Sequence, residues 1–220
     1  MDITYLGHSC FKLRGREASL VTDPYASSVG FAMPRVSADI VTVSHFHKDH
    51  CYTSGVSGTA RRTEPFLIQA PGEYEISGIS VFGVSCFHDG KSGTERGKNT
   101  VFTIHVDDVS IVHLGDLGHR LSDQEIEAMG SCDILLVPVG GVYSLDPKEA
   151  IEVVNQLQPA VVIPMHYRTP KHNPKVFGKL ATLEDFLHEG GFEQAARTEK
   201  LTLAKGSLPS EMEVVVLEKS

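Results

Sequence analysis

The sequence predicts an α/β protein in which two β-sheets pack together and helices lie on the outside. The first half of the chain is a succession of short apolar segments bounded by Gly, Pro or Asp, which is typical of strands. The second half alternates continuous apolar runs with amphipathic segments that carry helix caps. Strands dominate and the helices gather in the second half, so two packed sheets are favoured over one doubly wound sheet.

The predicted strands are rich in β-branched and aromatic residues and end at turn-forming residues. The segments DILLVPV and AVVIPMH lack polar alternation, so we expect them to be covered on both faces. The predicted strands cover residues 2–6, 19–23, 39–43, 66–70, 79–87, 100–106, 110–115, 133–139, 160–166 and 212–218.

Three helices are predicted from their caps and apolar stripes. Ser122 is followed three residues later by Glu125, which is a capping-box pattern, and Asp146 precedes Pro147 at a first helical position. The third helix is expected to stop at a Gly-Gly pair. The predicted helices cover residues 122–130, 146–157 and 182–191.

The composition indicates one compact domain spanning residues 1–220. The chain is 41% hydrophobic and has no internal repeat or low-complexity linker. Its start lacks the features of a secretory signal, no apolar run approaches membrane-spanning length, and the four cysteines form no CxxC pair. We therefore expect a reduced, cytoplasmic protein with no disulfide framework, no thiolate zinc site and no membrane partner. The net charge of −8 also argues against a general nucleic-acid binder, which needs a basic face.

The segment SHFHKDHC, residues 44–51, places three histidines and an aspartate directly after a predicted buried strand. His45 and His47 are two residues apart, so they share one face of an extended segment and could bind one metal ion, while a turn would let Asp49 and His50 face a second. Without a ligand, so many polar groups beside a buried strand would be poorly satisfied. The cluster therefore predicts a metal site, and its imidazoles and carboxylate suit Zn, Mn, Fe, Co or Ni better than Ca or Mg.

Three more predicted strands end in residues of the same kind. His88 follows one strand, Asp116 follows the next, and His166 closes the segment AVVIPMH. A rigid sheet can aim the side chains at its strand ends toward one point. We therefore expect these three residues to join the cluster of residues 44–51 at one edge of the fold.

The order of these motifs resembles that of the metallo-β-lactamase superfamily. HFHKDH matches the HxHxDH signature of that family, and the later histidines and aspartate follow in the family's order. Through YLGHSCF, TDPY, APGEYEI, VPVGG and IPMHY, the sequence also resembles the broad group of metal-dependent hydrolases that includes L-ascorbate-6-phosphate lactonase. The resemblance covers nearly the whole chain and implies a four-layer αββα sandwich with a two-metal centre at the sheet edge.

The resemblance also implies a set of metal ligands when it is carried over position by position. One divalent ion would be held by His45, His47 and His88, a second by Asp49, His50 and His166, and both by a bridging Asp116. We expect zinc, with Mn, Fe or Ni as alternatives. Two ions sharing a hydroxide would supply the nucleophile, and Asp49 would be the catalytic residue that orients it or relays its proton.

Four further residues are predicted to support the site. Asp23 could fix the second nitrogen of a ligating imidazole, although an aspartate before proline is also a common turn residue. His8 resembles a residue that related hydrolases place by the active site, and contact with substrate and plain packing both stay open. Arg168 and Lys171 open a basic run, residues 166–180, that contains no acid, and a glycine-rich loop at residues 88–98 carries more cations. In an acidic protein these cations predict an anionic substrate, with ordinary solvated loop residues as the alternative.

These features predict a metal-dependent hydrolase of a small, anionic ester, lactone or phosphodiester. The alternatives are a compact nuclease or phosphodiesterase acting on nucleic acid, and a non-catalytic metal-binding protein. Only 50 residues separate Asp116 from His166, which leaves no room there for a large nucleic-acid-binding insertion, and no ligand is missing. Two-iron redox members of the superfamily carry an acid where this chain has His47, so hydrolysis is favoured. The native substrate, the metal and a homo-oligomeric state stay open.

Overall fold

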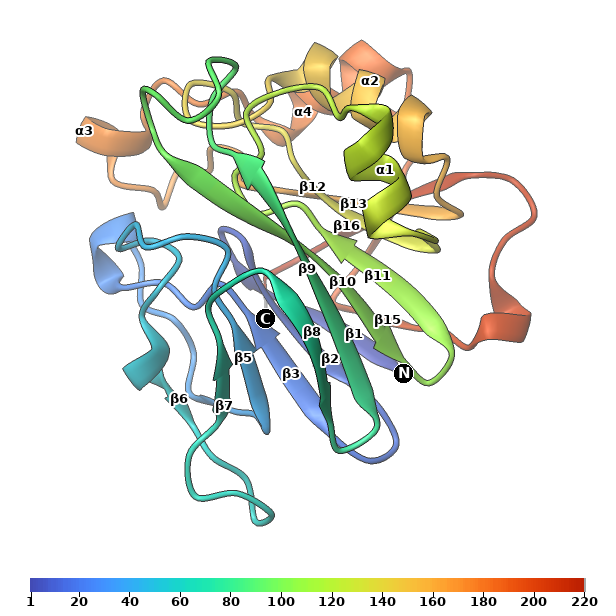
Figure 1. Cartoon of the computed structure of the whole chain (residues 1–220). Helices are drawn as coiled ribbons and strands as arrows, with labels where there is room; N and C mark the ends of the chain where they lie inside the picture. The colour runs from blue at the N-terminus through green and yellow to red at the C-terminus, as the bar shows by residue number, and fades with distance from the viewer. Residues whose placement is uncertain (220) are drawn as a thin grey trace.

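The computed structural model describes residues 1–219 and contains two β-sheets that pack against each other (Figure 1). Ser220, the last residue of the predicted domain, lies outside the described residues. The two-sheet arrangement predicted from the sequence is confirmed. No helix of residues 1–219 has the length and hydropathy that crossing a membrane requires.

The smaller sheet contains six strands in the order β15-β1-β2-β3-β5-β7. Its members are β1 (Asp2–Gly7), β2 (Cys10–Arg14), β3 (Ser19–Thr22), β5 (Ile40–Thr42), β7 (Phe66–Ile68) and β15 (Lys200–Thr202). The strands β15, β1, β2 and β3 pair antiparallel, whereas β3, β5 and β7 pair parallel. Two short strands, β4 (Val36–Ser37) and β6 (Val56–Ser57), pair separately.

The larger sheet contains eight strands in the order β14-β16-β13-β12-β11-β10-β9-β8. Its members are β8 (Gly72–Ile76), β9 (Ile79–Phe87), β10 (Lys98–Val106), β11 (Val109–His113), β12 (Ile134–Pro138), β13 (Val161–Met165), β14 (Ala196–Thr198) and β16 (Glu213–Leu217). The strands from β8 to β11 pair antiparallel and the remainder pair parallel. The strands β9, β11, β12 and β13 therefore run in one direction, and their carboxyl ends reach the same side of the sheet.

The helices cover the outer face of the larger sheet (Figure 1). They are α1 (Asp123–Met129), α2 (Pro147–Leu157) and α4 (Leu183–Gly190), while the one-turn α3 (Pro174–Phe177) lies apart. The capping box predicted at Ser122 is present, the predicted N-terminal residue Asp146 also forms one, and Thr182 forms a third. Each box satisfies backbone N–H groups that the first turn of a helix leaves without a partner. The three caps therefore fix where these helices begin.

The smaller sheet is covered by irregular chain in place of a long helix. Val21 and Val41, on its outer side, pack in a separate apolar cluster with Tyr25, Val29 and Phe177. The covering segments contain two 3-10 helices, Ser27–Val29 and Thr53–Gly55. The fourth layer of the expected sandwich is thus made mainly of loops, and these loops continue toward the end of the sheets where the histidines gather.

Candidate metal centre

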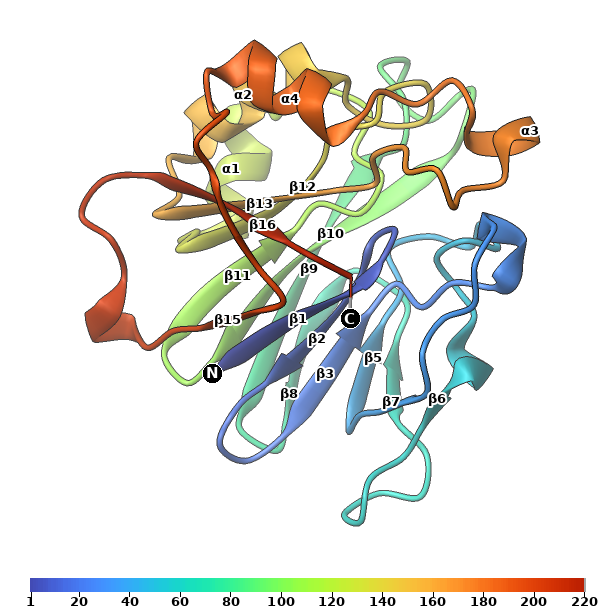
Figure 2. The ribbon, with the colours of Figure 1, turned by 180° about the vertical axis from the view of Figure 1, so that it is seen from behind.

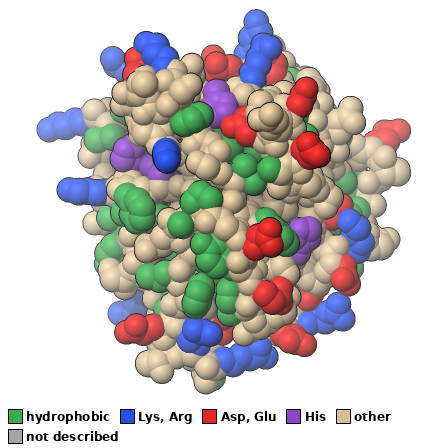
Figure 3. All heavy atoms as spheres, in the orientation of Figure 1, with side chains coloured by type: hydrophobic (Ala, Val, Ile, Leu, Met, Phe, Trp, Pro, Cys, Tyr) green, Lys and Arg blue, Asp and Glu red, His purple; other side chains and the backbone are tan. Residues whose placement is uncertain are grey.

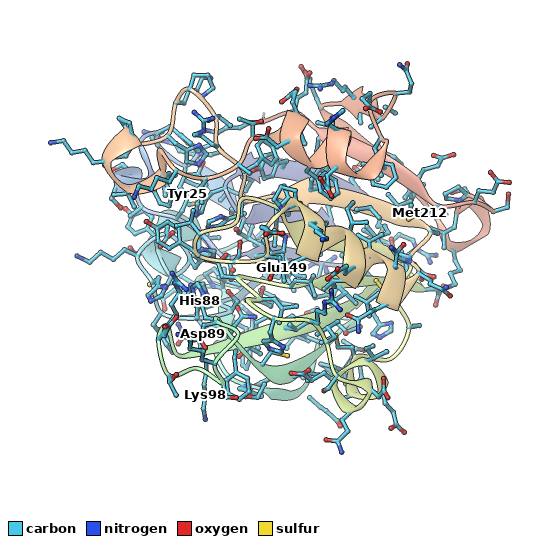
Figure 4. The ribbon with its side chains drawn as sticks, turned by 90° about the horizontal axis from the view of Figure 1, so that it is seen from above. Tyr25, His88, Asp89, Lys98, Glu149 and Met212 are labelled. Carbon is cyan, nitrogen blue, oxygen red and sulfur yellow. The ribbon has the colours of Figure 1, made fainter. Side chains whose placement is uncertain are left out.

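The predicted ligands meet where strands of both sheets end. The segment of His45 to His50 follows β5 of the smaller sheet, whereas His88, Asp116 and His166 follow β9, β11 and β13 of the larger sheet. Figure 3 shows histidine side chains at the surface on this side of the molecule, next to a Lys or Arg side chain. In Figure 4, His88 and Asp89 lie side by side on this flank, away from Met212 on the opposite flank. The structure therefore brings together residues that are more than 100 positions apart in the sequence.

Asp116 lies at the centre of the cluster and is buried. Four imidazole Nε2 atoms surround its Oδ2 atom: those of His50 at 3.3 Å, His88 at 3.4 Å, His166 at 3.4 Å and His45 at 3.9 Å. Burial alone would raise the pKa of Asp116, but the surrounding imidazoles hold it well below its usual range. Asp116 is thus a carboxylate, with imidazoles on more than one side.

Two groups of donor atoms flank this carboxylate. His45, His47 and His88 form one group, and Asp49, His50, His166 and His8 form the other; within each group the donor atoms lie within 4.8 Å of one another. The first group consists of the residues that the resemblance implies for one ion, and the second contains those implied for the other ion together with His8. The geometry could therefore hold two cations, one on each side of Asp116.

Several buried atoms of the cluster have no hydrogen-bond partner. They are Nε2 of His45 and His50, Oδ1 of Asp116, and both ring nitrogens of His88 and His166. Leaving buried polar atoms unpaired is costly, and their concentration at one point fits a bound cation. Burial lowers the pKa of His45 and of His166 to about 3, so both imidazoles are neutral near pH 7 and offer the lone pair that a metal ion needs.

Asp23 lies behind both groups of donors and is fully buried. Its Oδ1 accepts the backbone N–H of Ser44 at 2.7 Å, and its Oδ2 accepts both the Ser44 hydroxyl at 2.5 Å and the His50 Nδ1–H at 2.9 Å. The Ser44 hydroxyl, having donated to Asp23, accepts the Nδ1–H of His45 at 2.9 Å. Asp23 therefore directs the Nε2 lone pairs of both His45 and His50 toward Asp116, as the sequence predicted for one imidazole.

His50 shows what a cation would replace. Burial alone would lower the pKa of His50, but Asp116 and Asp23 on either side raise it well above its ordinary value. In the absence of a cation, these two carboxylates favour a second proton on His50. A divalent ion at Nε2 would replace that proton and supply positive charge between the two side chains.

His8 contacts the catalytic candidate Asp49, and it does so together with a residue that sequence reasoning missed. The backbone N–H of Thr169 donates to Nδ1 of His172 at 3.0 Å, so His172 carries its proton on Nε2. Nε2 of His172 lies 3.3 Å from Nδ1 of His8, and Nε2 of His8 lies 3.2 Å from Oδ2 of Asp49. The hydrogen bonds run in one direction, from Thr169 through both rings to Asp49, so His8 holds that carboxylate in place. No sequence pattern marks His172, and its role becomes visible only through its contact with His8 in the folded chain.

Several residues around the cluster have unusual backbone conformations or unusually close backbone contacts. His8, Asp23 and His166 all have positive φ, at 58°, 36° and 55°, a conformation that non-glycine residues seldom adopt outside special sites. A Cβ at Gly140 would lie 2.1 Å from the carbonyl oxygen of His166, so only glycine fits there. This close approach fixes the turn that carries His166.

A cleft of about 440 Å³ opens over the cluster. Its lining includes His47, Asp49, His88 and Asp116 together with Lys48, Arg96, Tyr143 and Val176. The guanidinium of Arg96 lies 5.8 Å from the ring centroid of Tyr143 and pairs with no acid of the described residues. The cations over the metal centre are therefore Lys48 and Arg96.

The expectation for Arg168 and Lys171 needs a correction. Neither residue lines the cleft over the cluster; both line a separate pocket beyond His8. Nε of Arg168 donates to the carbonyl of Leu180 at 3.0 Å, which turns the side chain away from the donors. Closeness in sequence to His166 was a poor guide because the chain turns outward after β13.

Asp89 shapes the loop that carries Arg96. Its carboxylate accepts four backbone N–H groups, from Lys91, Gly93, Glu95 and Arg96, at 2.7 to 3.1 Å. Burial alone would raise the pKa of Asp89, but these hydrogen bonds lower it to about 2. The loop is thus folded around one carboxylate and presents Arg96 to the cleft.

A further group of Cys86, His119 and Glu125 has metal-like spacing but does not fit a cation. Nε2 of His119 accepts the N–H of Phe87 at 3.2 Å and Nδ1 donates to the carbonyl of Arg120 at 2.8 Å, so no lone pair is free. Glu125 is engaged in the cap of α1, and burial raises the pKa of the Cys86 thiol well above its ordinary value. All four cysteines are unpaired thiols.

The sequence matches the family model of the β-lactamase superfamily domain over residues 2–166. It is 30% identical to the UPF0173 metal-dependent hydrolase of Desulforamulus reducens, with 87% of this chain and 99% of that protein covered. It is 32% identical to the UPF0173 metal-dependent hydrolase of Thermoplasma acidophilum, with 77% of this chain and 84% of that protein covered.

Solved structures show the same likeness. A crystal structure from Thermotoga maritima, provisionally described as a Zn-dependent hydrolase of the metallo-β-lactamase superfamily, has a TM-score of 0.79 and 38% identity, with 99% of this chain and 98% of that chain covered. Isothiocyanate hydrolase from Delia radicum gut bacteria has a TM-score of 0.64 and covers 93% of this chain and 100% of its own. Its identity of 15% means that this second likeness shows the fold alone. The fold class predicted from the sequence is confirmed.

Proposed function

Because this chain belongs to the metallo-β-lactamase superfamily and is a metal-dependent hydrolase, we propose that it cleaves a small anionic ester, lactone or phosphodiester at a two-metal centre. One observation carries the proposal: two groups of donors flank a buried carboxylate, and atoms of both groups are left without a hydrogen-bond partner. Such an arrangement is costly unless cations occupy it.

The proposed ligands are those implied by the sequence. His45, His47 and His88 would hold one ion, Asp49, His50 and His166 the other, and Asp116 would contact both. An imidazole-rich set with few carboxylates favours zinc, and reconstitution distinguishes it from Mn, Fe or Ni. When bound, a pair of such ions lowers the pKa of water toward neutrality and withdraws electron density from the bond that is cleaved.

The remaining tasks fall to side chains of the chain itself. Oδ2 of Asp49 is held by His8, whereas no hydrogen bond from a described residue reaches its Oδ1, which is available to take a proton from the attacking water. Its side chain is 22% exposed and borders the cleft, so substrate and water can both reach it. We assign Asp49 as the catalytic residue.

Substrate charge is proposed from the lining of the cleft. Arg96 and Lys48 face it without an acidic partner in a chain whose net charge is −8. An unpaired guanidinium in a half-enclosed cleft is suited to a carboxylate or phosphate group. The volume of about 440 Å³ accommodates a small molecule.

The test is hydrolysis of a panel by metal-stripped protein reconstituted separately with Zn, Mn, Fe or Ni. The panel contains a phosphodiester, a phosphomonoester, a lactone, a neutral thioester, a β-lactam and a single-stranded oligonucleotide. We expect turnover of an anionic ester, lactone or phosphodiester that Asp49→Asn, which keeps an oxygen to hold the ion but loses the proton-accepting carboxylate, abolishes while both ions stay bound. Binding of only one ion, preferred cleavage of the oligonucleotide, or absence of any turnover would contradict the proposal.

Arg96→Gln separates substrate charge from the chemistry. We expect KM for the anionic substrate to rise by about 10-fold, as loss of a charge-assisted hydrogen bond predicts, with kcat little changed. Lys98→Gln is the matched control, because Lys98 follows the same loop as the first residue of β10 and does not line the cleft. An equal effect of both variants would show that Arg96 acts only through the general charge of the surface.

A further inference from the structure

A second pocket, of about 420 Å³, lies beyond His8 and His172 as seen from the metal centre. It is bordered by the end of β1, the segment after β13, the start of α4 and the end of β16. Figure 2 shows the carboxyl end of the described chain beside the turn between β1 and β2, where this pocket lies. Its lining residues and those of the metal cleft have no member in common. The two are therefore distinct sites separated by a wall of side chains.

A close backbone approach builds this wall. A Cβ at Gly30 would lie 2.4 Å from the backbone nitrogen of Asn173, and that N–H donates to the carbonyl of Val29 at 2.7 Å. The contact brings the ring of Phe31 to 5.0 Å from that of His172. Only glycine permits two backbone segments to pack so closely, so the local sequence is fitted to form the pocket.

One part of the pocket is apolar and aromatic. Three aromatic and three aliphatic residues line it, and all of them except Phe31 are buried: Tyr5, Phe31, Tyr167, Leu183, Val216 and Leu217. The rings of Tyr5 and Tyr167 have centroids 6.3 Å apart. Such surfaces favour a flat, apolar ligand group, because aromatic side chains bury large area and stack in offset or edge-on geometry.

The other part of the pocket is cationic. Lys171 pairs with no carboxylate of the described residues, and Nζ of Lys219 lies 3.9 Å from the ring centroid of Phe31 with only the carbonyl of Ala32 as a hydrogen-bond partner, at 3.3 Å. Burial and the nearby charge of Lys171 lower the pKa of Lys219, so the two like charges are close enough to repel each other.

The acids of the pocket do not cancel this charge. Glu184 forms an ion pair with Arg197 at 3.0 Å. Of the other charged residues that line the pocket, Glu218 is negative, and three are positive: Arg168, Lys171 and Lys219. A net positive pocket stands out in a chain with a net charge of −8. Unpaired cations beside aromatic surface are the arrangement that recognises an anion carrying a ring.

We propose that this pocket binds a small anion that carries an aromatic ring, at a site separate from the metal centre. The negative group lies between Lys171 and Lys219, and the ring packs against Tyr5 and Tyr167. The occupant also contacts His172, whose other side reaches Asp49 through His8, so the two sites share one hydrogen-bonded wall.

The test uses benzenesulfonate as the probe, because a sulfonate is a weak metal ligand, and the metal-loaded full chain. Titration calorimetry gives the affinity, and backbone amide NMR locates the probe. We expect shift changes at residues 167–172 and 216–219 and none of similar size at residues 45–50 and 88–96. Methanesulfonate, which lacks the ring, and benzylamine, which has the opposite charge, should each bind at least about 10-fold more weakly.

Charge-reversal variants complete the test. Lys171→Glu and Lys219→Glu should each weaken binding of the probe by at least about 10-fold, and Lys171→Glu, at an exposed side chain, should do so with an unchanged melting temperature. Arg96→Gln, in the metal cleft, should leave binding of the probe unchanged. Shift changes centred on the metal cleft, equal binding of benzylamine, or probe affinity that survives both lysine reversals would overturn the proposal.

Discussion

Asp23→Asn is expected to weaken metal binding on both sides of Asp116, although Asp23 contacts no predicted metal position itself. Asparagine has nearly the shape of aspartate and tolerates the positive φ of 36° found there, so the backbone should not change. What changes is that one acceptor oxygen becomes an NH₂ donor. The partners of Asp23 are the Ser44 backbone N–H, the Ser44 hydroxyl and the His50 Nδ1–H.

Neither orientation of the new amide satisfies these partners. If its oxygen keeps the Ser44 N–H, its NH₂ faces His50 and Ser44, so His50 must move its proton to Nε2 and the Ser44 hydroxyl turns toward His45. His45 then also carries its proton on Nε2, which is the atom that faces Asp116. If the amide is reversed, its NH₂ faces the Ser44 N–H. A buried donor without an acceptor costs about 1 to 3 kcal/mol, and since about 1.4 kcal/mol corresponds to a factor of ten, metal affinity should fall by about 10- to 100-fold.

The assay is competition between the protein and a chelator for Zn, with the melting temperature of the metal-free protein measured beside it. Asp39→Asn is the matched control, because Asp39 is also buried and accepts the N–H and hydroxyl of Ser19 and the hydroxyl of Thr59, but lies away from the histidines. The control should lose stability and keep its metal affinity. Unchanged affinity in Asp23→Asn, or an equal loss in the control, would refute the role assigned to Asp23.

Two further predictions concern packing and pH. Gly118→Ala should destabilise the metal-free protein by about 1 to 3 kcal/mol and weaken metal binding, because a Cβ there would lie 2.5 Å from the carbonyl group of His88. Denaturant unfolding measures the stability and chelator competition measures the metal affinity. Gly206→Ala is the control and should change neither quantity, because a Cβ there would have nothing within 4 Å. For Asp39, burial alone would raise its pKa, but hydrogen bonds from Thr59 and Ser19 lower it below the ordinary value. The carboxylate therefore contributes stability above the unfolded pKa of about 4, and this contribution is lost as the pH falls through the lower folded pKa. The difference in unfolding free energy between the wild type and Asp39→Asn should accordingly be constant from pH 5 to 7 and shrink below about pH 4; a difference that stays constant down to pH 3 would show that the charge of Asp39 does not matter.

Periodicity and caps predicted most of the larger sheet, and the misses have physical reasons. The strand β2 follows β1 after only His8 and Ser9, and the reversal uses positive φ at His8 as well as at Gly7, which a single glycine in the sequence does not indicate. The strand β8, GEYEI, does alternate Glu73 and Glu75 with Tyr74 and Ile76, which pack against the core, but it is a short edge strand with mostly exposed residues, so its pattern is weak. Both strands exist because a neighbouring strand offers them hydrogen bonds.

The sequence predicted those site residues that are close together along the chain. It missed the residues that only the folding of distant segments brings to the site. The cluster of residues 44–51 follows one strand, so its members had to lie together. Which cations reach the cleft depends on how loops turn: Arg96 does because Asp89 folds its loop around one carboxylate, whereas Arg168 turns toward Leu180. The partnership of His8 with His172 joins positions 164 residues apart, and no local pattern signals it.

The proposed ligands come from both sheets, and this placement affects more than catalysis. His45 and His50 follow a strand of the smaller sheet, and Asp116 and His166 follow strands of the larger, so a shared cation would cross-link the two layers. A ligand that binds only the folded state stabilises it by about 2.7 kcal/mol at a free concentration of 100 times its Kd. In a cell short of the metal, the empty chain would unfold more often and be exposed to proteases. The supply of metal would then determine how much of this enzyme remains folded. A cell that lacks the metal would keep little metal-free enzyme that could be reactivated when metal returns.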